Sequence, residues 1–130
     1  MRFKLKVRRG ARALVMLIGT DITFDEFAIC PCDPEDFDEA LRYAQSRVAL
    51  PVFLVGGDFA IRAAPQVPNL RGVVAFHATD SIAAERLTVP LLLIGGSTAV
   101  ADVAPDSSRL DSGDEKLAVS VAQRFISVYA

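Results

Sequence analysis

The chain has 130 residues, of which 52% are hydrophobic and 23% are charged, and its net charge is −2. These values exclude disordered and fibrous classes, and the slight acidity argues against nucleic acid as the main partner. We expect a single domain over residues 1–130. The longest unbroken apolar stretch, residues 13–18, is too short to cross a membrane, so no membrane partner is expected.

Charge is distributed unevenly along the chain. Residues 1–12 contain only basic charged side chains, whereas residues 21–39 contain only acidic ones. A basic arm can bind phosphates or a membrane. However, the bases in residues 2–7 alternate with apolar residues, which is typical of an edge strand with one solvated face. With a tight turn at Gly10, this pattern predicts an N-terminal hairpin of strands 2–8 and 13–18.

Short apolar runs alternate with helical segments through the rest of the chain. This alternation predicts an α/β fold in one three-layer domain, with a mostly parallel sheet flanked by helices. Residues 101–113 are rich in Asp, Ser and Pro and are expected to form a loop. Beyond the hairpin, the expected strands are 27–30, 51–55, 72–76 and 90–94, and the expected helices are 34–47, 58–64, 81–87 and 114–130. The first helix is opened by Asp33 and Pro34, and the last is marked by Leu117, Val121, Phe125 and Val128.

Three of the apolar strands end in glycine, at Gly19, Gly56 and Gly95. In parallel sheets, ligand sites form at this carboxyl edge, where glycine lets the backbone approach a ligand or turn into a helix. Neither G-x-x-x-x-G-K-[ST] nor G-x-G-x-x-G is present. We therefore expect a ligand site at this edge but no nucleotide cofactor.

The segment Cys30-Pro31-Cys32 suggests redox or metal chemistry at first sight. The spacing of one residue strains an internal disulfide, and the chain has only one histidine to add to a metal site. A helix start lowers a thiol pKa, but the acids that follow raise it. We expect Cys30 in the core, Cys32 in a loop, no metal, and a reducing cytoplasmic setting.

Taken in order, these segments resemble the α/β-hydrolase superfamily, particularly its dienelactone-hydrolase-like branch. Leu17-Ile18-Gly19-Thr20 resembles the oxyanion-hole turn, and residues 51–60 resemble the nucleophile strand and elbow. Residues 87–96 resemble the strand that precedes the catalytic acid. The resemblance implies a trimmed hydrolase scaffold. A response-regulator receiver is the nearest competitor, but Gly56 stands where that family needs a phosphorylatable Asp.

The residues that should carry the chemistry depart from the family pattern. Gly56-Gly57-Asp58-Phe59-Ala60 replaces the elbow motif G-x-S-x-G, so Asp58 stands at the nucleophile position. An aspartate nucleophile needs a histidine that activates water, but the late histidine of the family is missing from residues 107–113. Ser97 and Thr98 stand where the acid is expected, and Asp102 is the nearest substitute.

His77 ends the strand after the elbow strand and is the chain's only histidine. Adjacent parallel strands bring Asp58 and His77 near one another, which allows a rebuilt dyad with Thr79, Asp80 or Ser97 as neighbours. The competing interpretation makes Asp58 a helix N-cap and His77 a strand-end residue bonded to a carbonyl. Ser97 and Thr98 form either a nucleophile pair or a turn or cap.

The sequence predicts an α/β-hydrolase-like domain that is catalytically degenerate and binds a small molecule or a partner. The alternative is a hydrolase for small esters or lactones that uses Asp58 and His77, and a receiver-like regulatory domain is a further option. No metal or cofactor is expected. Self-association into a homodimer is expected to cover sheet edges. The candidate ligand-binding residues are Gly19, Thr20, Gly57, Phe59, Ser97 and Thr98.

Overall fold

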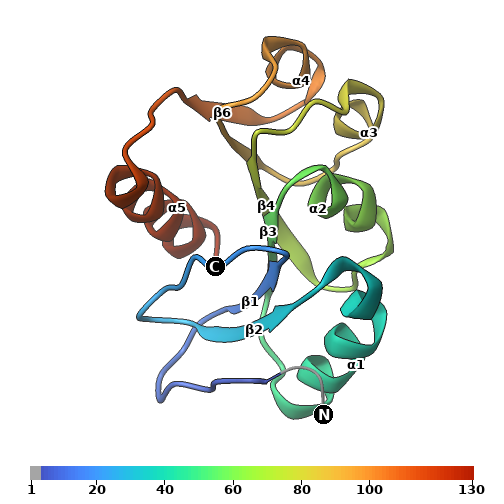
Figure 1. Ribbon diagram of the computed structural model, residues 1–130. Helices are drawn as coiled ribbons and strands as arrows, with labels where there is room; N and C mark the ends of the chain where they lie inside the picture. Colours follow the sequence, from blue (N-terminus) through green and yellow to red (C-terminus); the bar gives the residue numbers. More distant parts are fainter. Residues whose placement is uncertain (1–3) are drawn as a thin grey trace.

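A computed structural model describes residues 4–130 and shows a parallel sheet between two layers of helices (Figure 1). The strands, in the sheet order β2-β1-β3-β4-β5-β6, are β2 (Ala28–Cys32), β1 (Leu14–Ile18), β3 (Val52–Gly56), β4 (Leu70–Phe76), β5 (Leu91–Ile94) and β6 (Ser107–Leu110). The helices are α1 (Phe37–Arg47), α2 (Asp58–Ala63), α3 (Ser81–Glu85), α4 (Thr98–Val103) and α5 (Glu115–Tyr129), with 3-10 turns at Pro34–Asp36 and Ala64–Gln66. The predicted three-layer α/β architecture is confirmed. No helix within residues 4–130 is long and apolar enough to span a membrane.

The continuously apolar strands are buried on both faces. Alternate residues of β1 enter two separate cores, so that Met16 joins the core under α1 to α4 while Val15 joins the core under α5. Every residue of β1 and β3 is buried. This is why these strands read as unbroken apolar runs rather than as alternating patterns.

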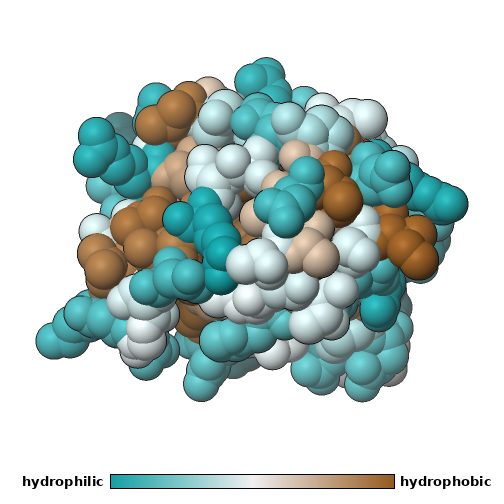
Figure 2. All heavy atoms as spheres, turned by 90° about the horizontal axis from the view of Figure 1, so that it is seen from above, coloured by the Kyte–Doolittle hydropathy of each residue, from teal (hydrophilic) through white to brown (hydrophobic). Residues whose placement is uncertain are grey.

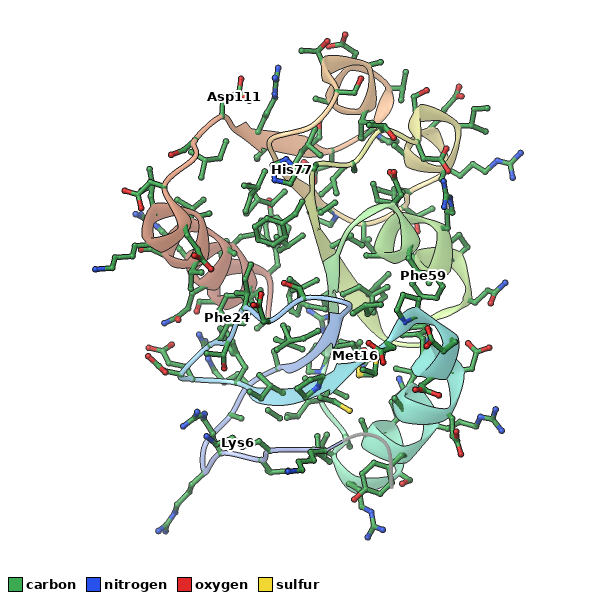
Figure 3. The ribbon with its side chains drawn as sticks, in the orientation of Figure 1. Lys6, Met16, Phe24, Phe59, His77 and Asp111 are labelled. Atoms are coloured by element: carbon green, nitrogen blue, oxygen red, sulfur yellow. The ribbon has the colours of Figure 1, made fainter. Side chains whose placement is uncertain are left out.

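The loop between β1 and β2 covers part of the sheet without forming a helix. Phe24 and Phe27 are buried in the core under α5, and their rings make an edge-to-face contact with centroids 6.0 Å apart. Figure 3 shows Phe24 between this loop and α5. Two aromatic side chains therefore cover apolar sheet surface that a helix would otherwise cover.

The expected N-terminal hairpin is wrong. Arg2 and Phe3 lie outside the described residues, and Lys6 pairs with Ile29 of β2 in an isolated antiparallel bridge instead of pairing with β1. The physical reason is that β1 lies between β2 and β3, so both of its hydrogen-bonding edges are occupied. Lys6 instead lies at the outer edge of β2.

Of two further expectations about the C-terminal third, one is wrong and one is confirmed. Residues 101–113 are not one loop, because they contain the end of α4 and the whole of β6. The expected C-terminal helix is confirmed as α5, whose buried residues are Ala118, Ala122, Phe125 and Ile126, whereas Leu117 and Val128 are exposed. Small alanine side chains let this helix lie close to the sheet, and Phe125 and Ile126 fill the space beside them.

Candidate active site and cleft at the carboxyl edge of the sheet

Asp58 is the first residue of α2, and its carboxylate bonds to the loop that follows β4. Its Oδ1 accepts hydrogen bonds from the N–H groups of Thr79 (2.8 Å) and Asp80 (2.9 Å), and its Oδ2 accepts one from the Thr79 hydroxyl (3.1 Å). Gly57 is the N-cap of α2, without a side-chain cap bond. The expected capping role of Asp58 is therefore wrong, and its carboxylate instead ties two loops of the carboxyl edge together.

The backbone at Asp58 lacks the strained turn of a nucleophile elbow. Within residues 4–130, Asn69 and His77 are the only residues other than glycine that have a left-handed backbone conformation, so Asp58 does not have one. An elbow holds its nucleophile on a sharp, strained turn so that the reactive atom projects from the sheet. Asp58 therefore lacks the backbone conformation that the predicted elbow requires.

The hydrogen bonds continue from Asp80 into neighbouring helices. Asp80 is the N-cap of α3, and its Oδ1 accepts a hydrogen bond from the N–H of Ala83 (3.0 Å). Its Oδ2 accepts a hydrogen bond from Nε of Arg62 (2.6 Å) on α2. These two hydrogen bonds hold the pKa of Asp80 below its ordinary value, and the bond from the Ala83 N–H has the larger effect. Asp58 and Asp80 together fix the relative positions of α2 and α3.

His77 follows β4 with a left-handed backbone (φ 54°) and an exposed side chain. Its N–H donates to the carbonyl of Ile94 (2.9 Å), so its backbone is held against β5. Its imidazole lies over Gly95, where a Cβ atom would stand 2.8 Å from Nδ1. Among the described residues, no hydrogen bond or ion pair joins His77 to Asp58. The imidazole therefore contacts the loop after β5, while the Asp58 carboxylate contacts the loop after β4.

The glycines after β5 allow this arrangement of loops. Gly96 has φ 84°, and a Cβ atom there would stand 2.6 Å from the carbonyl oxygen of Ala78. The same carbonyl accepts a hydrogen bond from the N–H of Ser97 (3.0 Å). Only glycine combines this backbone conformation with so close an approach.

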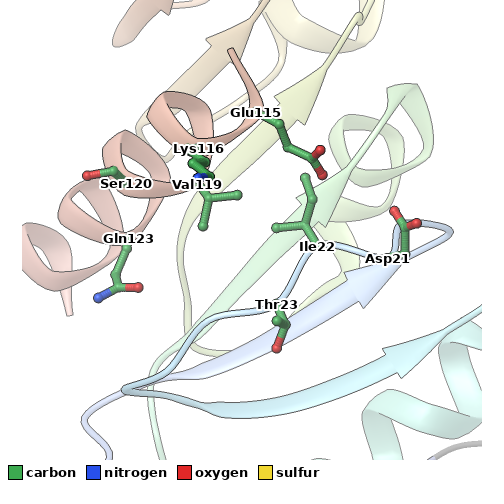
Figure 4. A pocket seen from close by; sticks show the side chains of 8 residues that line it. All are labelled: Asp21, Ile22, Thr23, Glu115, Lys116, Val119, Ser120 and Gln123. Atoms are coloured by element: carbon green, nitrogen blue, oxygen red, sulfur yellow. The ribbon is translucent and has the colours of Figure 1, made fainter.

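A cleft lies between the loop after β1 and the start of α5, which we call the α5 cleft. One part is a cavity of about 290 Å³ that His77, Thr20 and Ser112 line together with Phe76 and Ile94. Asp21, Ile22 and Glu115 line this part and also an adjoining hollow of about 490 Å³ along α5 (Figure 4). The α5 cleft thus has an apolar floor and a polar rim that includes the only imidazole in the chain.

The predicted ligand residues do not come together in one place. Thr20 lines the α5 cleft, and Gly19 lines a further hollow that meets it at Asp21. Phe59 packs its half-buried ring against Phe37 with centroids 5.5 Å apart, on the side of the sheet away from α5 (Figure 3).

Ser97 is the N-cap of α4, and its Oγ accepts a hydrogen bond from the N–H of Ala99 (3.2 Å). Thr98 is the exposed first residue of the same helix. The capping interpretation of Ser97 is therefore confirmed, and Gly57 caps α2 in a similar position.

Sequence reasoning missed Asp21, Ser112 and Glu115 as cleft residues. They come from two segments separated by most of the chain, and no motif connects them. Their position along the chain could have found them, because each lies in or just after a loop that follows the carboxyl end of a parallel strand.

Both cysteines are buried and unpaired. Burial raises the pKa of Cys30 to about 11, and burial together with Cys30, Asp33 and Asp36 raises the pKa of Cys32 to about 12. Cys32 ends β2, so the expectation that it lies in a loop is wrong. The thiols are therefore poor nucleophiles at neutral pH. Within residues 4–130, no group of three or more His, Cys, Asp or Glu side chains is placed to hold a metal ion.

No protein-family model and no curated protein matches the sequence. Solved structures that are similar to this chain include the esterase domain of a Rhodothermus marinus protein (TM-score 0.73, 13% identity, 95% of this chain and 89% of that chain covered). They also include a lipase-esterase related protein from Clostridium acetobutylicum ATCC 824 (TM-score 0.63, 8% identity, 98% of each chain covered). A third is YbtT, a type II thioesterase from the yersiniabactin biosynthetic pathway (TM-score 0.56, 12% identity, 98% and 96% covered).

The strand order of β1 to β5 is also that of a receiver domain, so topology alone does not separate the two interpretations. At these identities the similarity concerns the fold and not the activity. The chain has an α/β-hydrolase-like fold.

Proposed function

We propose that this chain is a small-molecule-binding domain in which the nucleophile position of a hydrolase fold has taken a structural role. The observation that carries the proposal is the Asp58 carboxylate, which accepts three hydrogen bonds from Thr79 and Asp80. A carboxylate held in this way has fewer lone pairs available for attack on a carbonyl carbon. The relaxed backbone of Asp58 and the absence of a late histidine in residues 107–113 support the same proposal.

The α5 cleft is the proposed binding site. It lies at the carboxyl edge of a parallel sheet, which is where ligands of α/β folds bind. Phe76 and Ile94 offer an apolar floor, while Thr20, His77 and Ser112 offer hydrogen-bonding groups. This combination suits a small ligand with an apolar body and a hydrogen-bonding end. We also propose a reducing cytoplasmic setting, which the two unpaired thiols support.

Two measurements test this function. The first uses p-nitrophenyl acetate, p-nitrophenyl butyrate and a small aromatic lactone as substrates. We expect that any turnover of these substrates by the wild type does not depend on both Asp58 and His77, so that it is not lost in both Asp58→Ala and His77→Ala. In amide NMR spectra, we expect apolar fragments with one polar group to shift signals of Asp21, His77 and Ser112. Phe59→Ala, outside the α5 cleft, should leave these shifts intact, and His77→Ala should weaken them. Fragments that shift no cleft signal would refute the binding site.

The second candidate is a small-substrate hydrolase that uses Asp58 and His77. It is supported by their placement after adjacent parallel strands, in which Gly56 pairs with Ala75. The Asp58 carboxylate would first have to leave Thr79 and Asp80, and the imidazole would have to turn away from Gly95. Turnover that is lost in both Asp58→Asn and His77→Ala, while both variants stay folded, would establish this candidate instead.

A further inference from the structure

The two edges of the sheet are treated differently. At the β2 edge, the backbone of Lys6 exchanges hydrogen bonds of 2.8 and 2.9 Å with Ile29, so the N-terminal segment covers part of this edge. At the other end, β6 is the last strand of the sheet within residues 4–130. An uncovered edge strand presents N–H and C=O groups that can pair with another strand.

The backbone N–H and C=O groups of β6 that point away from β5 belong to Ser107 and Arg109. The carbonyls of Asp106 and Leu110 accept hydrogen bonds from β5, at 2.8 Å from the Leu91 N–H and 2.9 Å from the Gly95 N–H. Successive residues of a strand direct their backbone groups to opposite sides. Ser107 and Arg109 therefore turn theirs away from β5, toward the solvent, and Asp111 continues the same alternation.

The charges along this edge are self-complementary about a two-fold axis. Arg109 and Asp111 form an ion pair of 2.9 Å within the chain, and Leu110 lies between them. If two copies of β6 pair antiparallel with Leu110 opposite Leu110, each Arg109 faces the Asp111 of the other copy. Centring the pair on Arg109 would instead place two guanidinium groups opposite one another, which is unfavourable.

Helix α5 also carries exposed apolar side chains. On α5, the pocket-lining residues Lys116, Val119 and Gln123 mark the side of the helix that faces the loop after β1. On the opposite side, Leu117 and Val128 are 44% and 67% exposed, with the half-buried Val121 between them. Figure 2 looks at the end of the molecule where β6 lies in Figure 1, and apolar side chains gather on the side of α5. Leu110 itself packs on the core under α5.

We propose that β6 pairs antiparallel with β6 of a second copy of this chain, forming a symmetric dimer with one continuous sheet. Leu110 meets its counterpart on the two-fold axis, and Arg109 and Asp111 alternate with those of the partner. The arrangement is isologous, because each residue contacts in the partner the residue that contacts it in return.

Sedimentation equilibrium of the whole chain tests the dimer, which should have twice the 14.0 kDa mass of the chain. Arg109→Pro removes an outward N–H that has no hydrogen-bond partner within residues 4–130, and we expect it to raise the dimer dissociation constant at least tenfold. Arg109→Asp and Asp111→Arg should each weaken the dimer. The double variant Arg109→Asp/Asp111→Arg should restore it, because it exchanges the charges while keeping their complementarity. The charge variants keep the test decisive if Arg109→Pro does not fold.

Oxidative cross-linking tests the register. Leu110→Cys should cross-link to its counterpart, since directly opposite residues of a non-hydrogen-bonded pair have Cα atoms about 4.5 Å apart. Ser108→Cys, on the same strand, should not cross-link, while the buried native thiols stay unreactive. A wild-type monomer at about 1 mM protein would overturn the proposal. A dimer that tolerates Arg109→Pro and both single charge variants, or one that cross-links through Ser108→Cys alone, would also overturn it.

Discussion

The role of Asp58 can be tested by comparing two substitutions that differ only in which hydrogen bonds they keep. Asp58→Ala removes all three bonds to the loop after β4 and leaves the N–H groups of Thr79 and Asp80 without their acceptor. Both N–H groups donate to the same oxygen, Oδ1, so Asp58→Asn keeps both bonds when its amide oxygen takes that place. The asparagine NH2 group can then donate to the Thr79 hydroxyl.

The expected magnitudes follow from the number of bonds lost. The Thr79 hydroxyl is exposed and can bond to water instead, so only the two backbone N–H bonds are counted. At about 1 kcal/mol for each of them, Asp58→Ala should cost about 2 kcal/mol of unfolding free energy. For a chain of this length, that lowers Tm by roughly 8 °C. Asp58→Asn should cost less than about 0.5 kcal/mol, because both backbone donors keep an acceptor.

Urea denaturation and calorimetry of wild type, Asp58→Ala and Asp58→Asn would measure these differences. Thr79→Val is the matched control, because it removes only the hydroxyl contact and leaves both N–H bonds in place. If Asp58→Asn destabilised the protein as much as Asp58→Ala, the stabilisation would come from the negative charge of Asp58 and not from its two hydrogen bonds to backbone N–H groups. If Asp58→Ala were as stable as wild type, the structural role would be refuted.

Three further outcomes are expected. Phe24→Ala should cost about 3 kcal/mol in urea denaturation although Phe24 lies in a loop, because its ring is 1% exposed and replaces a covering helix; a cost below about 1 kcal/mol would contradict this. Gly96→Ala should destabilise the protein by more than about 2 kcal/mol in the same assay, because a Cβ atom there clashes with the Ala78 carbonyl at 2.6 Å; wild-type stability would show that this contact relaxes. Stability should fall as pH rises above about 9, because the thiols ionise near 9.0 when unfolded but only near 11 (Cys30) and 12 (Cys32) when folded. Cys32→Ala should reduce this alkaline loss, and rapid thiol modification of the native protein at pH 8 would contradict the burial.

The central strands could be predicted from sequence because their environment is uniform. In β1 and β5, both faces are covered, so every position favours an apolar residue and the run is unbroken. The edge strand β6 could not be predicted in this way. Its sequence, Ser107-Ser108-Arg109-Leu110, is polar because the strand is half exposed, and it is a strand only because β5 offers it a free edge.

The pairing of the N-terminal segment illustrates the same limit. The alternation of Lys4, Leu5, Lys6 and Val7 is typical of an extended segment with one solvated face, but the pattern carries no information about the partner. The structure assigns Lys6 to Ile29 because β1 has no open edge. Which strand receives a neighbour depends on the order of the whole sheet and not on local sequence.

The α/β layers, the glycine-ended strands and the absence of a late histidine from residues 107–113 follow from residue type and from spacing along the chain. The contacts of Asp58 and His77 depend on the three-dimensional arrangement of the loops. As a helix cap, Asp58 would bond within its own turn, but its acceptor oxygens meet N–H donors 21 and 22 residues further along the chain. The position of the His77 imidazole depends on its left-handed backbone and on the close approach of Gly95. Contacts between loops that are distant in sequence are set by how the strands lie in the sheet, and local spacing does not encode them.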